Sequence, residues 1–424
     1  GKNMSRKNAI ALINVFILSL FFVKAAICQT ELTMWWHAAG EPAQMALVKE
    51  LVDEFNASQS EWKVVITAFP QIAYNDAVVA AGLAGTLPDI IDIDGPILPN
   101  WAWAGYIQPL DIDESLIANY LPGPKGVWDD KLYGIGMWDA AIALVTRQSY
   151  LEELDLRTPT LEEPWDAKEF QQALDAAKSS GKFDYALDLG MAWTGEWYPY
   201  AFSPFLQSFG GDIVNRSNYQ TAEGVLNGEE ALAFGEWWQN LFTGGYAQAM
   251  QDGADRDIGF TTGKYAFSWN GNWAALGILE AYDDTVFLPA PDFGYGSKIG
   301  AASWQLSIAS TSKHPDGANA FINFALQPHN LARFSEGTGL IPATAVAAEL
   351  TNNYRAGGPM EVFFELSDRQ GMLRPVTPGY PVMAKVFEKA LADIANGADV
   401  ADTLDAAVDE INSNIQQNNG YGHK

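Results

Sequence analysis

The hydrophobic and polar positions of this chain follow two periods in turn, one typical of strands and one typical of helices. Short β-branched and apolar runs predict strands at Leu32–Trp36, Trp62–Phe69 and Ile90–Ile93. Between these strands, apolar residues recur every three or four positions over Glu41–Ser58 and Tyr74–Gly85, which predicts two helices. Strands that alternate with helices indicate an α/β unit with a largely parallel sheet.

The same alternation resumes after residue 140. The strands expected in this part are Ile142–Thr146, Tyr185–Leu189, Lys264–Trp269 and Gln305–Ala309. The helices expected are Asp166–Ser179, Trp197–Phe209, Ala231–Phe242, Asp316–Leu326, Val382–Ile394 and Val400–Gln416. Trp238 falls on the apolar stripe of its helix, so we expect it in the core. The pattern therefore predicts two α/β halves.

Residues 1–28 have the order of segments found in an export signal. A basic start is followed by an apolar run over Ala9–Val23 and then by small residues that lead to Cys28. The run is shorter than the ~20 residues of a membrane-spanning helix. We expect cleavage before Gln29 and a protein that works in the periplasm or outside the cell. Lipid anchoring through Cys28 is the alternative, but Ile27 is larger than the residue that usually precedes a lipidated cysteine.

Composition narrows the class of protein. The 396 residues that follow the signal are too many for one compact core, which favours two domains of roughly 200 residues. The chain carries a net charge of −27, and removing the four basic residues of the signal makes it −31. Such a charge repels phosphate backbones, so we expect no nucleic-acid partner. Cys28 is the only cysteine, so no disulfide can form after it. We expect a monomer.

No sequence motif supports catalysis. The four histidines lack metal-binding spacing, and no phosphate-binding glycine loop or Gly-x-Ser-x-Gly elbow occurs. A glycosidase needs two carboxylates beside one bond, and a chain with 52 acidic residues always offers some pair. We therefore expect a protein that is not an enzyme and uses no metal or cofactor. A secreted carbohydrate-active hydrolase remains the alternative.

Several segments, taken in order, carry a family resemblance over nearly all of the mature chain. They are Gly263–Trp273 (with its Gly-Lys-x-Ala-x-x-x-x-Gly-x-Trp pattern), Leu87–Ile91, Ala104–Asp111, Trp304–Ile308 with Ser312–Ala318, and Arg374–Tyr380. Together they resemble the extracellular solute-binding proteins of carbohydrate ABC importers, the family 1 sugar-binding proteins similar to maltose-binding protein. They are specific to the family and not to one sugar.

The resemblance implies a type II periplasmic-binding-protein fold, in which two α/β lobes are joined by hinge segments and close on a ligand. The N-terminal lobe would comprise 29–140 and 304–343, and the C-terminal lobe 141–303 and 344–424. The chain would cross between lobes near 138–144, 302–308 and 341–347. The implied function is to bind a mono- or oligosaccharide, or a related polyol or glycoside, and deliver it to the permease of an ABC importer.

A sugar presents a flat C–H face, which an indole can cover, and a rim of hydroxyls, which charged and amide groups can bind. Strand ends, crossovers and the family segments supply the candidates. These are Trp36, His37, Asp94, Trp138, Asp139, Trp193, Trp197, Asn270, Trp273, Trp304 and Arg374. Trp35 should point away from Trp36 into the core. Asp92 is a rival to Asp94, and His37 and Arg374 also leave a charged, non-sugar solute open.

Overall fold

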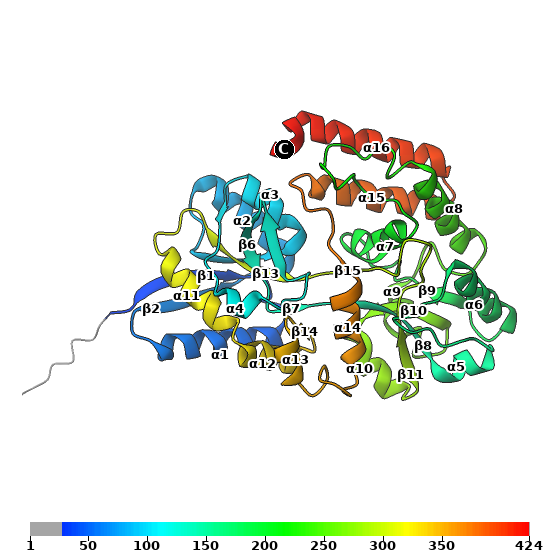
Figure 1. Ribbon diagram of the computed structural model, residues 1–424, viewed down its shortest axis with the longest axis horizontal. Coiled ribbons are helices and arrows are strands. Elements are labelled where there is room, and N and C mark those ends of the chain that lie inside the picture. Colours follow the sequence, from blue (N-terminus) through cyan, green and yellow to red (C-terminus); the bar gives the residue numbers. More distant parts are fainter. Residues whose placement is uncertain (1–27, 424) are drawn as a thin grey trace, which may run out of the picture.

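The computed structural model describes residues 28–423, and the predicted signal lies outside them except for Cys28, which is exposed. Two mixed sheets, each covered by helices, form the two lobes seen side by side in Figure 1. We call the lobe around the seven-stranded sheet the N-terminal lobe and the lobe around the four-stranded sheet the C-terminal lobe. The two-lobed architecture expected from the sequence is therefore present.

The sheet of the N-terminal lobe has the order β2-β1-β3-β13-β6-β5, with β4 also paired to β13. Its strands are β1 (Thr30–Trp36), β2 (Trp62–Ala68), β3 (Ile90–Asp94), β4 (Ile107–Gln108), β5 (Lys125–Trp128), β6 (Lys131–Ile135) and β13 (Trp304–Ala309). Pairing is parallel between β1 and both its neighbours, but β13 runs antiparallel to β3, β4 and β6.

Helices cover both faces of this sheet. One face carries α1 (Pro42–Ser58), α11 (Pro315–Ala325) and α12 (Pro328–Thr338), and the other carries α2 (Gln71–Ala84) and α3 (Leu98–Trp103). Val48, Leu51, Val52 and Phe55 are buried on α1, as its periodicity predicts. α13 (Ala345–Glu349) lies where the lobes meet, because Ala347 packs in the core of this lobe and Ala348 packs in the core of the other.

The C-terminal lobe has a four-stranded sheet of order β11-β8-β10-β9. Its strands are β8 (Ile142–Arg147), β9 (Tyr185–Asp188), β10 (Tyr265–Gly271) and β11 (Thr285–Leu288). Only β9 and β10 pair in parallel. The expectation of largely parallel sheets was wrong for both lobes. The chain returns between the lobes several times, and a strand that enters from the hinge end runs against its neighbours.

Most helices of the C-terminal lobe begin and end close to the predicted positions, namely α6 (Ala167–Ser180), α7 (Trp197–Ser208), α8 (Glu229–Thr243), α15 (Tyr380–Ala395) and α16 (Val400–Gln417). The lobe also contains α10 (Asn272–Ala281) and α14 (Glu361–Gln370), which the sequence pattern did not predict. On α6, the Asp166 side chain accepts a hydrogen bond from the Glu169 N–H, and Gly181 ends the helix at φ 66°. Trp238 is fully buried and donates its indole N–H to the Leu391 carbonyl, as expected of a core residue.

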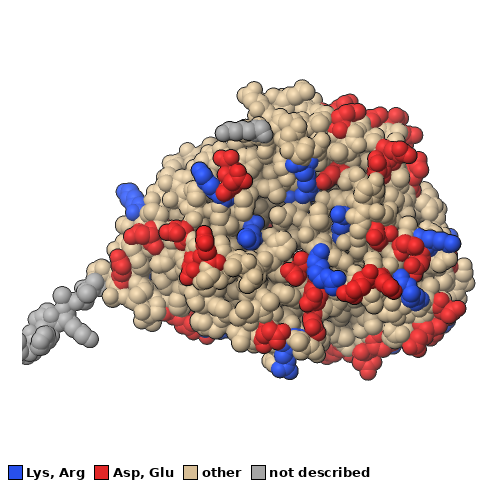
Figure 2. Space-filling model, viewed as in Figure 1, with Lys and Arg blue, Asp and Glu red and all other residues tan. Residues whose placement is uncertain are grey.

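Three connecting segments meet between the lobes (Figure 1). β7 (Trp138–Asp139) pairs with β14 (Ile341–Pro342), and Ala140 forms a bridge with Ala302. A further pair, β12 (Ile299–Gly300) with β15 (Gly371–Met372), lies beside them. The segments expected as crossovers from the sequence are thus neighbours in space. On the face shown in Figure 2, acidic side chains are spread over both lobes.

Candidate functional site

His37 and Trp304 lie at the edge of the N-terminal lobe that faces the C-terminal lobe. His37 directly follows β1, and its imidazole lies on the Trp304 indole with ring centroids 3.5 Å apart. The His37 Nδ1 pairs with the carboxylate of Asp92, which is buried. Tyr74 donates its hydroxyl proton to the Asp92 carbonyl at 2.7 Å. Asp92 therefore holds His37 inside the lobe, while Trp304 stays half-buried.

Asp94 ends β3 opposite Trp304 in the sheet register. Its carboxyl group is the less enclosed of the two rivals, since Asp94 is half-buried and Asp92 is 1% exposed. Burial raises the pKa of Asp94 to about 6, although the nearby Arg374 guanidinium opposes this. The geometry thus favours Asp94 over Asp92 as a group that could meet a ligand.

Arg374 lies in the segment that links β15 to α15. Its Nη1 donates to Glu196 Oε2 at 2.6 Å, and the Tyr380 hydroxyl donates to the same oxygen at 2.6 Å. Burial disfavours the charged guanidinium, but Tyr380, Glu196 and Asp94 outweigh it and raise the pKa of Arg374. Arg374 is therefore a charged, compensated group between Asp94 of one lobe and Glu196 of the other.

Four rings of the C-terminal lobe form a group that we call the aromatic cluster, namely Trp193, Trp197, Tyr200 and Trp273. Centroids are 4.9 Å apart for Trp193 and Trp197 and 6.2 Å apart for Trp193 and Trp273. Trp273 is 41% exposed, whereas Trp197 is buried and donates its N–H to the Leu189 carbonyl. The cluster thus offers an apolar surface through Trp273 and Trp193, supported from behind by Trp197.

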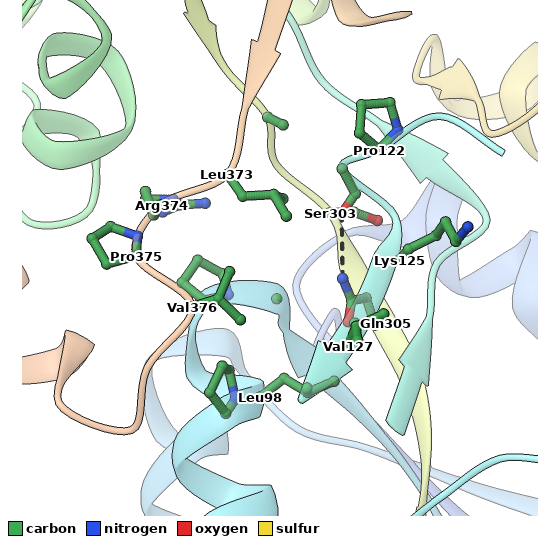
Figure 3. A pocket seen from close by; sticks show the side chains of 16 residues that line it. Leu98, Pro122, Lys125, Val127, Ser303, Gln305, Leu373, Arg374, Pro375 and Val376 are labelled. Carbon is green, nitrogen blue, oxygen red and sulfur yellow. Dashed lines mark hydrogen bonds between the residues drawn. The ribbon is translucent and has the colours of Figure 1, made fainter. Parts of the chain in front are cut away.

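A cavity of about 270 Å³ lies between the N-terminal lobe and the Arg374 segment (Figure 3). Its walls come from Gly95–Pro99, the turn and strand over 122–127, the connector at 301–305 and residues 373–376. Gln305 Oε1 and Arg374 Nε are buried here and have no hydrogen-bond partner among the described residues. The Arg374 guanidinium also lies 5.3 Å from the centroid of the Tyr200 ring, so Arg374 borders both the cavity and the aromatic cluster.

Two candidates from the sequence, Trp36 and Trp138, are buried and cannot meet a ligand directly. Trp36 is 3% exposed and donates its N–H to Gln44, and Trp138 is 5% exposed and stacks on Phe334 at 5.0 Å. These two residues therefore pack the core of the N-terminal lobe. Trp35, expected in the core, is half-buried and packs on Phe69. The alternation of side chains along β1 therefore did not separate a core residue from a ligand-facing one, because helices cover both faces of this sheet.

Asp139 and Asn270 make local contacts. The Asp139 carboxylate accepts hydrogen bonds from the Ala302 N–H at 2.9 Å and the Ser367 hydroxyl at 2.6 Å, which ties β7 to the connector at Ala302 and to helix α14. Burial raises the pKa of Asp139 to about 7. Asn270 is buried and its side chain accepts from the Gly271 N–H. Asp139 is thus a brace between the lobes in this structure.

Sequence reasoning did not select Glu196, Tyr200 or Tyr380 as site residues. Tyr200 follows Trp197 by three positions, a helical spacing that places both rings on one side of α7. That spacing was a usable signal for Tyr200. The roles of Glu196 and Tyr380 had no local signal, because both depend on Arg374, which is 178 residues from Glu196 in the chain.

Comparison with known proteins identifies the family. The model of the bacterial extracellular solute-binding proteins matches residues 50–359. The chain belongs to this family. It is 26% identical over 317 residues to an uncharacterised lipoprotein of Streptomyces antibioticus, covering 72% of this chain and 68% of that one. It is 24% identical over 361 residues to the maltodextrin-binding protein MdxE of Bacillus subtilis, covering 81% of each.

A solved structure supports the fold of this solute-binding protein. The cyclic α-maltosyl-1,6-maltose binding protein of Arthrobacter globiformis superposes with a TM-score of 0.76 at 21% identity, covering 92% of this chain and 100% of that one. Within residues 28–423, no helix is both long and apolar enough to cross a membrane. The same residues contain no group of three or more His, Cys, Asp or Glu side chains suited to hold a metal ion.

Proposed function

We propose that this solute-binding protein binds an oligosaccharide of the maltodextrin type between its lobes and delivers it to an ABC importer. The aromatic cluster carries the proposal. Its Trp193 and Trp273 rings suit the C–H faces of pyranose units, and Arg374, Glu196 and Asp94 beside it suit the hydroxyl rim. The names of the Bacillus subtilis and Arthrobacter globiformis proteins favour glucose oligomers over other sugars.

We propose as binding residues those that border the aromatic cluster or the space between the lobes. They are Trp193, Trp273, Trp304, Asp94, Glu196 and Arg374. Covering ~60 Å² of apolar sugar surface with one indole contributes about 1.5 kcal/mol. Two stacked units would contribute about 3 kcal/mol, and charge-assisted hydrogen bonds to the hydroxyl rim would add to this.

The charge balance of the site argues for a neutral ligand. Arg374 is paired with Glu196 at 2.6 Å, and Asp94 lies close enough to influence the pKa of Arg374. Because Glu196 and Asp94 already compensate the Arg374 charge, little net positive charge is left for an anionic solute. The sugar reading is therefore preferred to the binding of a charged metabolite.

The proposed partners and location follow from the same function. The protein would work outside the cytoplasm as a monomer, present its sugar to the permease subunits of the importer, and bind no nucleic acid. We propose the lobe boundaries expected from the sequence. The Streptomyces relative is named a lipoprotein, so lipid anchoring stays the alternative to release. The intact mass of the exported protein distinguishes the two. An N-terminal Cys28 that bears acyl chains would overturn release.

Calorimetric titration with maltose, maltotriose and maltotetraose tests the proposal, with cellobiose as the β-linked control. We expect saturable binding of at least one maltooligosaccharide and weaker binding of cellobiose. The same mixtures, kept for a day and separated by chromatography, should contain unchanged sugar. A lack of binding across the series would overturn the ligand class. Product in excess of the protein would instead favour a carbohydrate-active hydrolase.

A further inference from the structure

Arg256 is a buried cation directly behind the aromatic cluster. It lies on the short helix α9 (Gly253–Ile258) and is 3% exposed. Its Nη1 donates to Asp188 Oδ2 at 2.9 Å, and its Nη2 donates to the Trp269 carbonyl at 3.1 Å. A buried charge needs such partners to be tolerated. These contacts fix the guanidinium in one orientation.

The flat side of this guanidinium faces the tryptophans. Arg256 Cζ lies 4.0 Å from the centroid of the Trp193 ring and 5.3 Å from that of Trp197. A guanidinium at this distance attracts the face of an indole and stacks on it. Trp193 lies in a loop between β9 and α7, where no secondary structure holds its side chain. The ring is held by its side-chain contacts, which are the guanidinium of Arg256 on one side and the Trp197 and Trp273 rings of the aromatic cluster.

The backbone at Gly190 passes close to the side chains of Arg256 and Trp197. Gly190 has φ 70°, and a Cβ at this position would lie 2.9 Å from both Arg256 Cζ and Trp197 Nε1. Only glycine fits that conformation and that space readily. The Asp188 carboxylate also accepts from the Gly190 N–H at 2.9 Å and from Gln251 Nε2 at 2.7 Å. The loop that carries Trp193 is thus tied to the same carboxylate that holds Arg256.

The ion pair with Asp188 uses only one nitrogen of the guanidinium. Both Asp188 oxygens are already engaged, because Oδ2 accepts from Arg256 Nη1 and from the Ser268 hydroxyl at 2.8 Å, and Oδ1 accepts from Gly190 and Gln251. Arg256 Nε is buried without a hydrogen-bond partner among the described residues. The flat face of the guanidinium is therefore left to the Trp193 ring.

We propose that Arg256 is a positioning residue for sugar binding, which holds the Trp193 and Trp197 rings in the orientation that the ligand needs. This inference rests on the proposed function, because Trp193 must meet the sugar for its orientation to matter. Rings held before the ligand arrives lose less conformational freedom on binding. Lysine cannot replace arginine here, because an ammonium group has no flat face to stack.

The test is a double-mutant cycle with maltotriose as the probe, measured by calorimetry. Arg256→Lys keeps the charge beside Asp188 and should weaken binding about fivefold or more. In the Trp193→Ala background the same substitution should have little further effect, because Arg256 acts through Trp193. Additive losses, or unchanged affinity in the single variant, would overturn the inference.

Arg147→Lys is the matched control. Arg147 pairs with Asp284 at 2.7 Å and lies 4.0 Å from the Tyr282 ring centroid, so it has the same chemistry away from the aromatic cluster. It should keep the wild-type affinity. If Arg256→Lys does not fold, the double variant Asp188→Asn with Arg256→Gln, which removes both charges together, replaces it in the cycle. The same outcomes then support or overturn the inference.

Near-UV circular dichroism of the ligand-free proteins provides a readout that does not depend on the sugar. Arg256→Lys should lose the tryptophan signal that Trp193→Ala also removes, and Arg147→Lys should retain it. A failure of the wild type to bind maltotriose would count against the proposed function. A wild-type-like spectrum for Arg256→Lys would count against the positioning role itself.

Discussion

The imidazole of His37 lies flat against the indole of Trp304, with ring centroids 3.5 Å apart and planes 7° apart. His37 directly follows β1 and Trp304 begins β13, and these two strands are separated in the sheet by β3. Their stack therefore spans the end of β3, where Asp94 lies. Because His37 covers one face of Trp304, a ligand can meet only the remaining surface of this indole.

Trp304→Ala should weaken maltotriose binding about tenfold, because an indole surface that contributes ~1.5 kcal/mol is lost. It should also lower the melting temperature, since His37 loses its stacking partner, worth about 0.5–1.5 kcal/mol. Trp62→Ala is the control, because Trp62 is half-buried in the same lobe but begins β2 at the far end of the sheet. Equal affinities for the two variants would remove Trp304 from the site.

Trp273→Ala should weaken maltotriose binding about tenfold. It should lower the melting temperature only modestly, because the side chain is 41% exposed although it packs against Trp193 and Trp197. Leu276→Ala is the matched control. Leu276 lies one turn further along α10 and is 45% exposed, so its loss removes apolar surface of similar exposure. Titration calorimetry and melting curves compare the two. A parallel loss of affinity in the leucine variant would indicate a general effect on α10.

The Asp139 carboxyl group should make stability depend on pH in a defined direction. Burial raises its pKa from 3.8 to about 7 in the folded protein. A carboxyl with a raised folded pKa contributes stability that is present in full below 3.8 and is lost as the pH rises through about 7. At about 1.36 kcal/mol per pKa unit, the loss is at most about 4 kcal/mol.

Asp139→Asn should therefore gain stability relative to the wild type as the pH is raised from about 5 to about 8, because asparagine does not ionise over this range. Melting curves of both proteins at several pH values measure the difference, in which the other titrating groups cancel. A difference that stays constant with pH would contradict a raised pKa for Asp139.

Sugar binding should close the lobes about the connecting segments. Only a ligand that meets both lobes, such as one between Trp304 and Trp273, binds the closed state better and shifts the equilibrium. Small-angle scattering should show a smaller radius of gyration with saturating maltotriose than without it. The Trp273→Ala protein at the same sugar concentration is the control and should change less. Binding without any change in the wild-type profile would argue against closure.

The sequence alone determined most of the local structure and the class of the protein. The capped helix over 167–180, the strands over 30–36 and 62–68 and the later helices could be predicted because burial on one face leaves a periodic pattern. The two α/β halves followed from the order of these elements. The family followed from segments such as Gly263–Trp273, where spacing and residue type agree.

Only the tertiary structure decided which polar and aromatic residues share a site. Trp36 and Trp138 differ little from Trp273 in local pattern, but helices cover both faces of the N-terminal sheet and bury the first two. The pair of Arg374 with Glu196 depends on where the chain crosses between lobes, and no local period records such a contact. Local periodicity reports one buried face of one element, whereas a site between lobes is set by packing among distant elements.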